Sequence, residues 1–282
     1  MAPRSGAANG QAGHGPDAPA LDGEFPLDAN LIESFESDGY VLVRGLASPG
    51  EVAAYRPLIE AVALDRAWDK RPLAERDTYG KAFLQSQNLW CVDPLIARFV
   101  LARRFAGVAA KLLRVESVRL YHDQALCKEP GGGRTPWHQD QYYWPLDTDR
   151  TITLWMPLVD VPAEVGSMTF VTGSYKLGDL RGRAISDESD AEFERVIADR
   201  QLAVHTFGAM SAGDATFHAG WTIHSAGPNP TDALRTVMTI IYFADGARVL
   251  PELTPAQDFD RRLWLSALPP GALIDQPGNP RL

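Results

Sequence analysis

The stretch PWHQDQYYWP, residues 136–145, places a histidine two positions before an aspartate in a chain that has only six histidines. On an extended strand, side chains two residues apart point to the same face, so His138 and Asp140 would converge while Gln139 turns away. An imidazole and a carboxylate that converge in this way are suitable metal ligands. The spacing therefore predicts part of a metal site.

A third ligand must come from a distant part of the chain. The candidates are His122, His205, His218 and His224. The segment GDATFHAGWTIHSAGPNPTDALRTVMTIIYF is the most informative, because it places His224 at the end of a short strand and Arg235 at the start of another. Two imidazoles and one carboxylate form the facial set that binds Fe(II) and leaves coordination positions open. The planar guanidinium of Arg235 could hold the distal carboxylate of a dicarboxylic acid whose other end chelates the iron.

The elements that must position these residues fall into two regions, of which the first, up to about residue 115, is mostly helical. Apolar residues at helical spacing predict a helix that begins near Leu27, and YVLVRG then predicts a strand. The segment SPGE predicts a second helix, with Ser48 as N-cap and Glu51 completing a capping box. A third helix is expected over residues 94–113.

After residue 115 the chain consists of short β-rich segments bounded by Gly, Pro, Asp or Asn. These segments are SVRLYHDQALCK, RTITLWMPLVDV, GSMTFVTGS, LAVHTFG, DATFHAG and RTVMTIIYFAD. They recur without the helices that a parallel sheet requires, so the pattern predicts an antiparallel sandwich or barrel. Residues 177–201 are acidic and partly helical, as expected of an insertion at a barrel mouth.

Four ordered motifs carry a resemblance to a known family. They are WHQD at 137–140, TLWMPLVDV at 153–161, GSMTFVTGSYK at 166–176 and HSAGPNPTDALR at 224–235. Through them the chain resembles the phytanoyl-CoA dioxygenase family of Fe(II)- and 2-oxoglutarate-dependent oxygenases, over roughly residues 27–243. The resemblance implies a mainly β fold, a double-stranded β-helix (a cupin-like jelly roll) with flanking N-terminal helices.

The same resemblance assigns expected roles to individual residues, with Fe(II), 2-oxoglutarate and O2 as cofactor and cosubstrates. His138, Asp140 and His224 match the iron ligands, Arg235 the residue that binds the C5 carboxylate of 2-oxoglutarate, Trp155 an aromatic beside that cosubstrate, and Gln124 a polar contact to it. His218 is the competing metal ligand, although a packing or supporting role suits it better. His122 and His205 are expected to be structural, and Asp123 is the alternative carboxylate.

Several reactions are compatible with this set. Hydroxylation is the expected outcome, and epimerisation, desaturation or oxidative ring closure are the alternatives. Halogenation is not expected, because related halogenating oxygenases replace the carboxylate ligand by a small residue and Asp140 is present here. Two other classes remain, a Zn(II)-dependent cupin hydrolase and a non-catalytic binding module. Arg235 and Trp155 count against both, because neither class needs a dicarboxylate clamp beside the metal.

The substrate is predicted only by class. Trp137, Tyr142, Tyr143 and Trp144 would be divided between core and the wall of a pocket for an apolar or ring-shaped molecule. A coenzyme A thioester would call for basic residues at the pocket mouth; the candidates are Lys128, Arg134, Arg150, Lys176, Arg181 and Arg183. Acidic neighbours dilute these charges, which favours a small natural-product intermediate such as a polyketide, terpenoid or glycoside.

The amino-acid composition limits which partners and which cellular location are expected. The net charge of −9 argues against a nucleic-acid partner, and the absence of a run of about 18 apolar residues argues against a membrane span. Cys91 and Cys127 lack a C-x-x-C pattern, which favours a reduced, cytoplasmic protein. Residues 1–26, with His14, are expected to be a disordered tail before one oxygenase domain over 27–282. The expected partner is a small-molecule substrate, and no oligomeric state is predicted.

Overall fold

The computed structural model describes residues 18–180 and 184–282, which form two antiparallel sheets. The larger has the strand order β1-β8-β5-β10-β3-β2 and the smaller the order β4-β9-β6-β7. The strands are β1 (Tyr40–Val43), β2 (Leu84–Gln87), β3 (Val118–Lys128), β4 (Thr135–His138), β5 (Thr151–Pro157), β6 (Met168–Val171), β7 (Val204–Thr206), β8 (Ala215–Ala219), β9 (His224–Ala226) and β10 (Arg235–Ala244). Successive strands alternate between the two sheets over much of the chain, which is a jelly-roll arrangement. The expected double-stranded β-helix is therefore confirmed.

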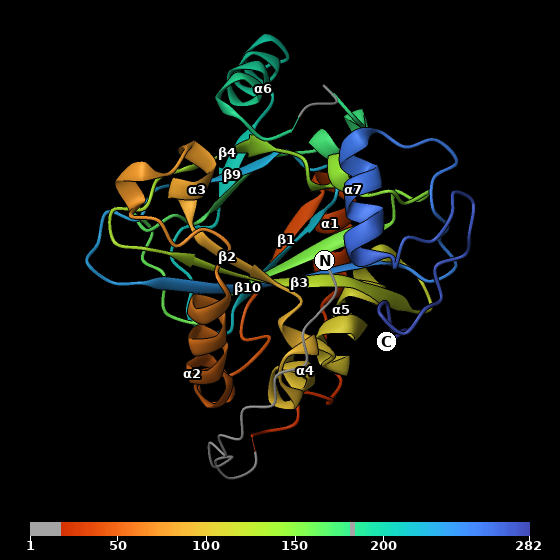
Figure 1. Ribbon diagram of the computed structural model, residues 1–282, viewed down its shortest axis with the longest axis horizontal. Coiled ribbons are helices and arrows are strands. Elements are labelled where there is room, and N and C mark those ends of the chain that lie inside the picture. Colours follow the sequence, from red (N-terminus) through yellow and green to blue (C-terminus); the bar gives the residue numbers. More distant parts are fainter. Residues whose placement is uncertain (1–17, 181–183) are drawn as a thin grey trace.

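Helices cover one face of the larger sheet. Figure 1 shows α2 and α4 on one side of this sheet and β4, β9 and α6 on the other. The helices are α1 (Ala29–Asp38), α2 (Pro49–Arg66), α3 (Thr78–Ala82), α4 (Pro94–Val100), α5 (Arg103–Leu113), α6 (Asp187–Asp199) and α7 (Pro255–Trp264). In the part of the chain that the structure describes, no helix combines the length and apolar character needed to cross a membrane.

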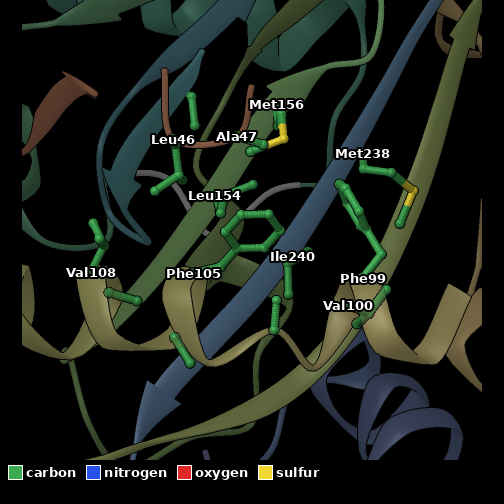
Figure 2. Packing of buried hydrophobic residues seen from close by; sticks show 14 of the residues in the cluster. Leu46, Ala47, Phe99, Val100, Phe105, Val108, Leu154, Met156, Met238 and Ile240 are labelled. Atoms are coloured by element: carbon green, nitrogen blue, oxygen red, sulfur yellow. The ribbon is translucent and has the colours of Figure 1, made fainter. Parts of the chain in front are cut away.

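The long central strand β10 separates the helical core from the interior of the jelly roll. Alternate side chains of a strand point to opposite faces. Met238 and Ile240 therefore pack with Phe105 in the buried cluster beneath the helices (Figure 2). Arg235 and Thr239 point the other way and line a cavity between the sheets. Side-chain alternation along β10 thus places one face of the strand in the hydrophobic core and the other face in the cavity.

The N-terminal helices agree with those predicted from the sequence, with one exception. At the start of α2, Ser48 Oγ accepts from the Glu51 backbone N–H at 3.2 Å, and the Glu51 carboxylate accepts from the Ser48 N–H at 2.7 Å, which confirms the capping box. The single helix expected over 94–113 was wrong, because the chain breaks between α4 and α5. In one continuous helix, Phe99 and Phe105 would point to different faces. The break lets both enter the core, with ring centroids 5.3 Å apart.

Packing of the described chain begins before residue 27. Leu21 is buried, its carbonyl accepts from the Arg104 backbone N–H at 3.0 Å, and the Pro19 carbonyl accepts from the Tyr55 hydroxyl. The expected boundary at residue 26 therefore does not mark where packing starts. Residues 1–17, with His14, lie outside the described residues.

Two later segments surround the opening of the jelly roll. In the insertion over 177–201, α6 packs against β4, and the buried carboxylate of Asp190 accepts from the Trp137 backbone N–H at 2.7 Å. Beyond the region of resemblance, α7 packs against the short 3-10 helix Asp140–Tyr143, which directly follows β4. Elements remote in sequence therefore support the strand that carries His138.

Candidate active site

The three predicted metal ligands come together where β4 ends and β9 begins; they are His138, Asp140 and His224. Strands β4 and β9 are antiparallel neighbours, and His138 and His224 are directly paired in their register. One ligand atom from each of the three residues lies within 4.8 Å of the others. The Asp140 Oδ1 atom is 3.5 Å from His138 Nε2 and 3.6 Å from His224 Nε2. The residues predicted from spacing thus face one point.

Hydrogen bonds orient both imidazoles toward that point. His138 Nδ1 lies 2.8 Å from the Pro136 carbonyl and His224 Nδ1 lies 2.9 Å from the Thr222 carbonyl. A carbonyl can only accept, so each Nδ1 carries the proton and each Nε2 presents its lone pair. Burial, together with the neighbouring His138, holds the pKa of His224 well below its ordinary value. The neutral imidazole is the form that binds a metal ion.

Asp140 is held so that only one oxygen faces the imidazole Nε2 atoms of the set. Its Oδ2 accepts from the Thr153 hydroxyl at 2.9 Å and from His218 Nε2 at 3.2 Å, which leaves Oδ1 toward His138 and His224. Burial opposes ionisation, yet the adjacent imidazoles lower the pKa of Asp140 well below its usual range. The donor set of two neutral imidazoles and one carboxylate oxygen fits Fe(II).

The other candidate ligands have different surroundings. His218 contacts the far oxygen of Asp140 and supports that carboxylate from behind. His122 is buried in the cavity wall, where desolvation lowers its pKa to about 4. His205 lies on β7 and stacks on Tyr40. The carboxylate of Asp123 accepts from two backbone N–H groups, of Leu89 and Trp90, so it shapes a turn.

Arg235 is a buried cation without an anionic partner among the described residues. Its side chain lines the cavity and the residue is 3% exposed. Nη1 donates to the Gly166 carbonyl at 2.8 Å, and the guanidinium lies 5.4 Å from the centre of the Trp155 ring. Nε has no hydrogen-bond partner among the described residues. Burial lowers its pKa to about 10, so it remains charged at neutral pH. Because an unpaired buried charge is costly, this site is suited to an anionic ligand.

Lys128 lies directly opposite Arg235 in the β3–β10 register, although it does not line the cavity. It is not a basic residue of the pocket mouth, as considered for coenzyme A, because it is the fully buried last residue of β3 and its ammonium donates to the Gly133 carbonyl. Burial, and then Arg235, lower its pKa to about 7. Period-two alternation from Gln124 would have placed it on the inner face. Two cationic side chains therefore lie at this end of the site.

Trp155 and Gln124, which the resemblance assigns to the cosubstrate site, both line the cavity. Trp155 is buried beside Arg235, and the side-chain oxygen of Gln124 accepts from the amides of Gln85 and Gln87. These two glutamines on β2 were not singled out from the sequence, although their alternate positions on one strand are the same signal that identified His138 and Asp140.

The cavity has a volume of about 330 Å³ and mainly aromatic and apolar walls away from the metal set. Tyr143 and Trp144 line it, whereas Trp137 packs in a separate cluster with Phe193, and Tyr142 is not part of the lining. Residues that the sequence reasoning missed complete the wall: Trp68, Tyr79, Phe83, Phe259, Asp260, Leu263 and Trp264. Their segments lie outside the four motifs, so no local signal marked them.

The described part of the cavity lining contains little positive charge. Among the described lining residues, Arg235 is the only lysine or arginine. Of the residues considered for coenzyme A, Arg134 pairs with Asp190 and Lys176 donates to the Ser37 carbonyl. Arg181 and Arg183 lie outside the described residues. The lining therefore favours an apolar ligand over a polyphosphate.

Comparisons with known proteins identify the family of the chain. The chain matches the phytanoyl-CoA dioxygenase (PhyH) family over residues 35–237. It is 24% identical to the ectoine dioxygenase of Stutzerimonas stutzeri (strain A1501), with 77% of each chain covered. It is 27% identical to the ectoine dioxygenase of Streptomyces anulatus, with 86% of this chain and 89% of the relative covered.

Two solved structures are also similar. The non-heme alpha-ketoglutarate-dependent carbocyclase SnoK from nogalamycin biosynthesis has 26% identity and a TM-score of 0.73, with 92% of this chain and 99% of that chain covered. The epimerase SnoN, in complex with Fe3+, alpha-ketoglutarate and nogalamycin RO, has 28% identity and a TM-score of 0.74, with 89% and 97% covered. The chain belongs to the phytanoyl-CoA dioxygenase family and is an iron- and 2-oxoglutarate-dependent oxygenase.

Proposed function

We propose that His138, Asp140 and His224 are the iron ligands, that Arg235 binds the C5 carboxylate of 2-oxoglutarate, and that the enzyme oxidises a small natural-product intermediate. The observation that carries the proposal is the presence, in one cavity, of the three converging ligand atoms and a buried guanidinium without an anionic partner among the described residues. A zinc hydrolase or a binding module has no need for that guanidinium.

Each side chain of the site has a separate proposed role. Thr153 and His218 hold Asp140 so that Oδ1 faces the imidazoles, and the carbonyls behind His138 and His224 fix their tautomers. Arg235 and the ring of Trp155 bind and orient the distal end of 2-oxoglutarate, with Gln124 as a polar contact. When bound, the iron couples oxidative decarboxylation of 2-oxoglutarate to activation of O2 for attack on a substrate C–H bond.

Hydroxylation is the proposed outcome. Ring closure and epimerisation are the alternatives with specific support, because SnoK and SnoN are named for those reactions. The aromatic wall and the single basic residue among the described lining residues support an apolar or ring-containing substrate over a coenzyme A thioester. A cytoplasmic location is supported by Cys91 and Cys127, which are both free thiols.

The experiment that tests this function is substrate-stimulated succinate release. The Fe(II)-loaded protein is incubated with 2-oxoglutarate, O2 and a panel of polyketides, terpenoids and glycosides, and products are analysed by mass spectrometry. We expect at least one compound to accelerate succinate formation and to gain oxygen or lose hydrogen. Asp140→Ala, which removes one iron ligand, should abolish this release. A Zn(II)-loaded protein that hydrolyses panel compounds without O2 would contradict the proposal.

A further inference from the structure

Helix α7 forms one wall of the cavity although it lies beyond the family match, which ends at residue 237. Phe259 and Leu263, both on this helix, line the cavity while remaining 58% and 42% exposed. Trp68 also lines the cavity and is 65% exposed. Large apolar side chains that remain exposed at a cavity opening are typical of a surface that a ligand covers. The residues of α7 that face inward can therefore contact a substrate.

Asp260 is the one acidic residue that α7 directs into this wall. It is 9% exposed, its Oδ2 accepts from the Tyr121 hydroxyl at 3.1 Å, and no lysine or arginine among the described residues pairs with it. The basic residues of the same helix do not neutralise Asp260, because Arg261 and Arg262 both pair with Asp258. Asp260 is therefore a buried carboxyl group that faces ligand space and has no counter-ion among the described residues.

Asp260 contacts two aromatic residues, because Tyr121 and Trp264 both donate hydrogen bonds to it, and each of these lies beside a further ring. The ring centroids of His122 and Trp264 are 4.7 Å apart, and those of Tyr121 and Trp144 are 5.7 Å apart. Burial raises the pKa of Asp260 to about 7 despite hydrogen bonds from Tyr121 and Trp264. The same desolvation keeps His122 neutral and raises the pKa of Tyr121, so neither supplies a positive charge. Aromatic faces around a carboxylate attract organic cations.

We propose that the substrate carries a protonated or quaternary amine, and that Asp260 together with the rings of Trp144 and Trp264 binds it. This inference rests on the proposed oxygenase function and names the substrate class of that site. The ammonium group would lie at the α7 wall, and the apolar body of the substrate would extend along Phe259 and Leu263. Binding at this fixed point would determine which C–H bond faces the iron, so Asp260 is a specificity-determining residue.

The test uses choline and its uncharged isostere, 3,3-dimethylbutan-1-ol, which have similar shapes and differ in charge. Each is titrated at about pH 8 into anaerobic protein loaded with Fe(II) and 2-oxoglutarate, and binding is followed by tryptophan fluorescence. We expect the wild type to prefer choline by about tenfold, which corresponds to about 1.4 kcal/mol of attraction between the ammonium group and the Asp260 carboxylate beside the rings. Asp260→Asn keeps an acceptor for the Tyr121 hydroxyl and should lose this preference.

Asp258→Asn is the matched control, because it makes the same change on the same helix at a carboxylate that does not line the cavity. It should keep the preference for choline. Equal binding of the two probes by the wild type, or a preference that survives Asp260→Asn, would overturn the inference. Tighter binding of the neutral alcohol, lost in Asp260→Asn, would overturn it too and would make Asp260 a hydrogen-bond donor. The charge-transfer band of the Fe(II)–2-oxoglutarate complex should persist in Asp260→Asn, whereas its absence from the wild type would contradict the oxygenase assignment instead.

Discussion

Replacing Arg235 by alanine should weaken 2-oxoglutarate binding while leaving iron binding in place. The guanidinium is buried beside Trp155 and has a free Nε, so it can form two hydrogen bonds to one carboxylate. It is not a ligand to the metal, and His138, Asp140 and His224 are held by their own hydrogen bonds. Arg235→Lys should recover only part of the affinity, because a lysine keeps the charge and loses the planar fork.

The size of the effect follows from burial. Loss of one partner from a buried, hydrogen-bonded charge pair costs roughly 2 to 5 kcal/mol of binding. Since about 1.4 kcal/mol corresponds to a factor of ten, the apparent 2-oxoglutarate requirement should rise at least tenfold. We expect the lower part of the range, because the ammonium of Lys128 lies opposite Arg235 and supplies some positive charge.

The assay is an anaerobic titration of the Fe(II) protein with 2-oxoglutarate, followed by its weak visible charge-transfer band, with Fe(II) binding measured separately. Lys128→Met is the matched control and should shift the titration less than Arg235→Ala does. An unchanged 2-oxoglutarate requirement in Arg235→Ala, with iron still bound, would refute the reasoning. A larger shift in Lys128→Met would show that Lys128 holds the C5 carboxylate.

Three further predictions concern the metal ligand, the buried histidine and the core. Asp140→Gly should bind iron more weakly and lose most oxygenation. The wild type should form no chlorinated product in excess chloride, as checked by mass spectrometry. Full activity of Asp140→Gly would show that Asp140 is not a ligand. Burial lowers the pKa of His122 to about 4, so the unfolded protein takes up this proton at a higher pH than the folded protein does. The stability that neutral His122 contributes is therefore fully present above about pH 6.5 and is lost as the pH falls toward 4. Between pH 6.5 and 4.5 the free energy of unfolding of the metal-free protein should fall by roughly 2 to 3 kcal/mol more in wild type than in His122→Asn, and parallel slopes in urea unfolding would contradict this. Phe105→Ala should cost about 3 to 5 kcal/mol in the same assay, and the exposed Phe259→Ala less than about 1 kcal/mol; equal losses would mean that Phe105 is not a core residue.

The parts of the site that the sequence predicted were those with local signals. His138 and Asp140 are two residues apart on an extended segment, and the β-rich pattern with its ordered motifs placed His224 and Arg235 at strand ends. Side-chain alternation is a property of each strand alone, so it can be read without knowing the fold. The structure brings these four residues into one cavity, as expected.

The parts that were missed depend on contacts between distant segments. Lys128 lies beside Arg235 because β3 pairs with β10 in one register, and alternation along β3 predicts the face of Lys128 but not this neighbour. Asp260 becomes a cavity residue only because α7 packs against the segment that follows β4. The break between α4 and α5 likewise depends on the core that Phe99 and Phe105 both enter.

The measurement that tests the central claim most directly compares two histidines that both approach Asp140. His224 Nε2 faces Oδ1 and His218 Nε2 contacts Oδ2, so only His224 is placed to share a metal ion with His138. Fe(II) and 2-oxoglutarate are added anaerobically to each alanine variant, and the charge-transfer band is recorded. We predict that His224→Ala abolishes the band and that His218→Ala largely retains it. A band that survives His224→Ala and disappears in His218→Ala would contradict the assigned iron site.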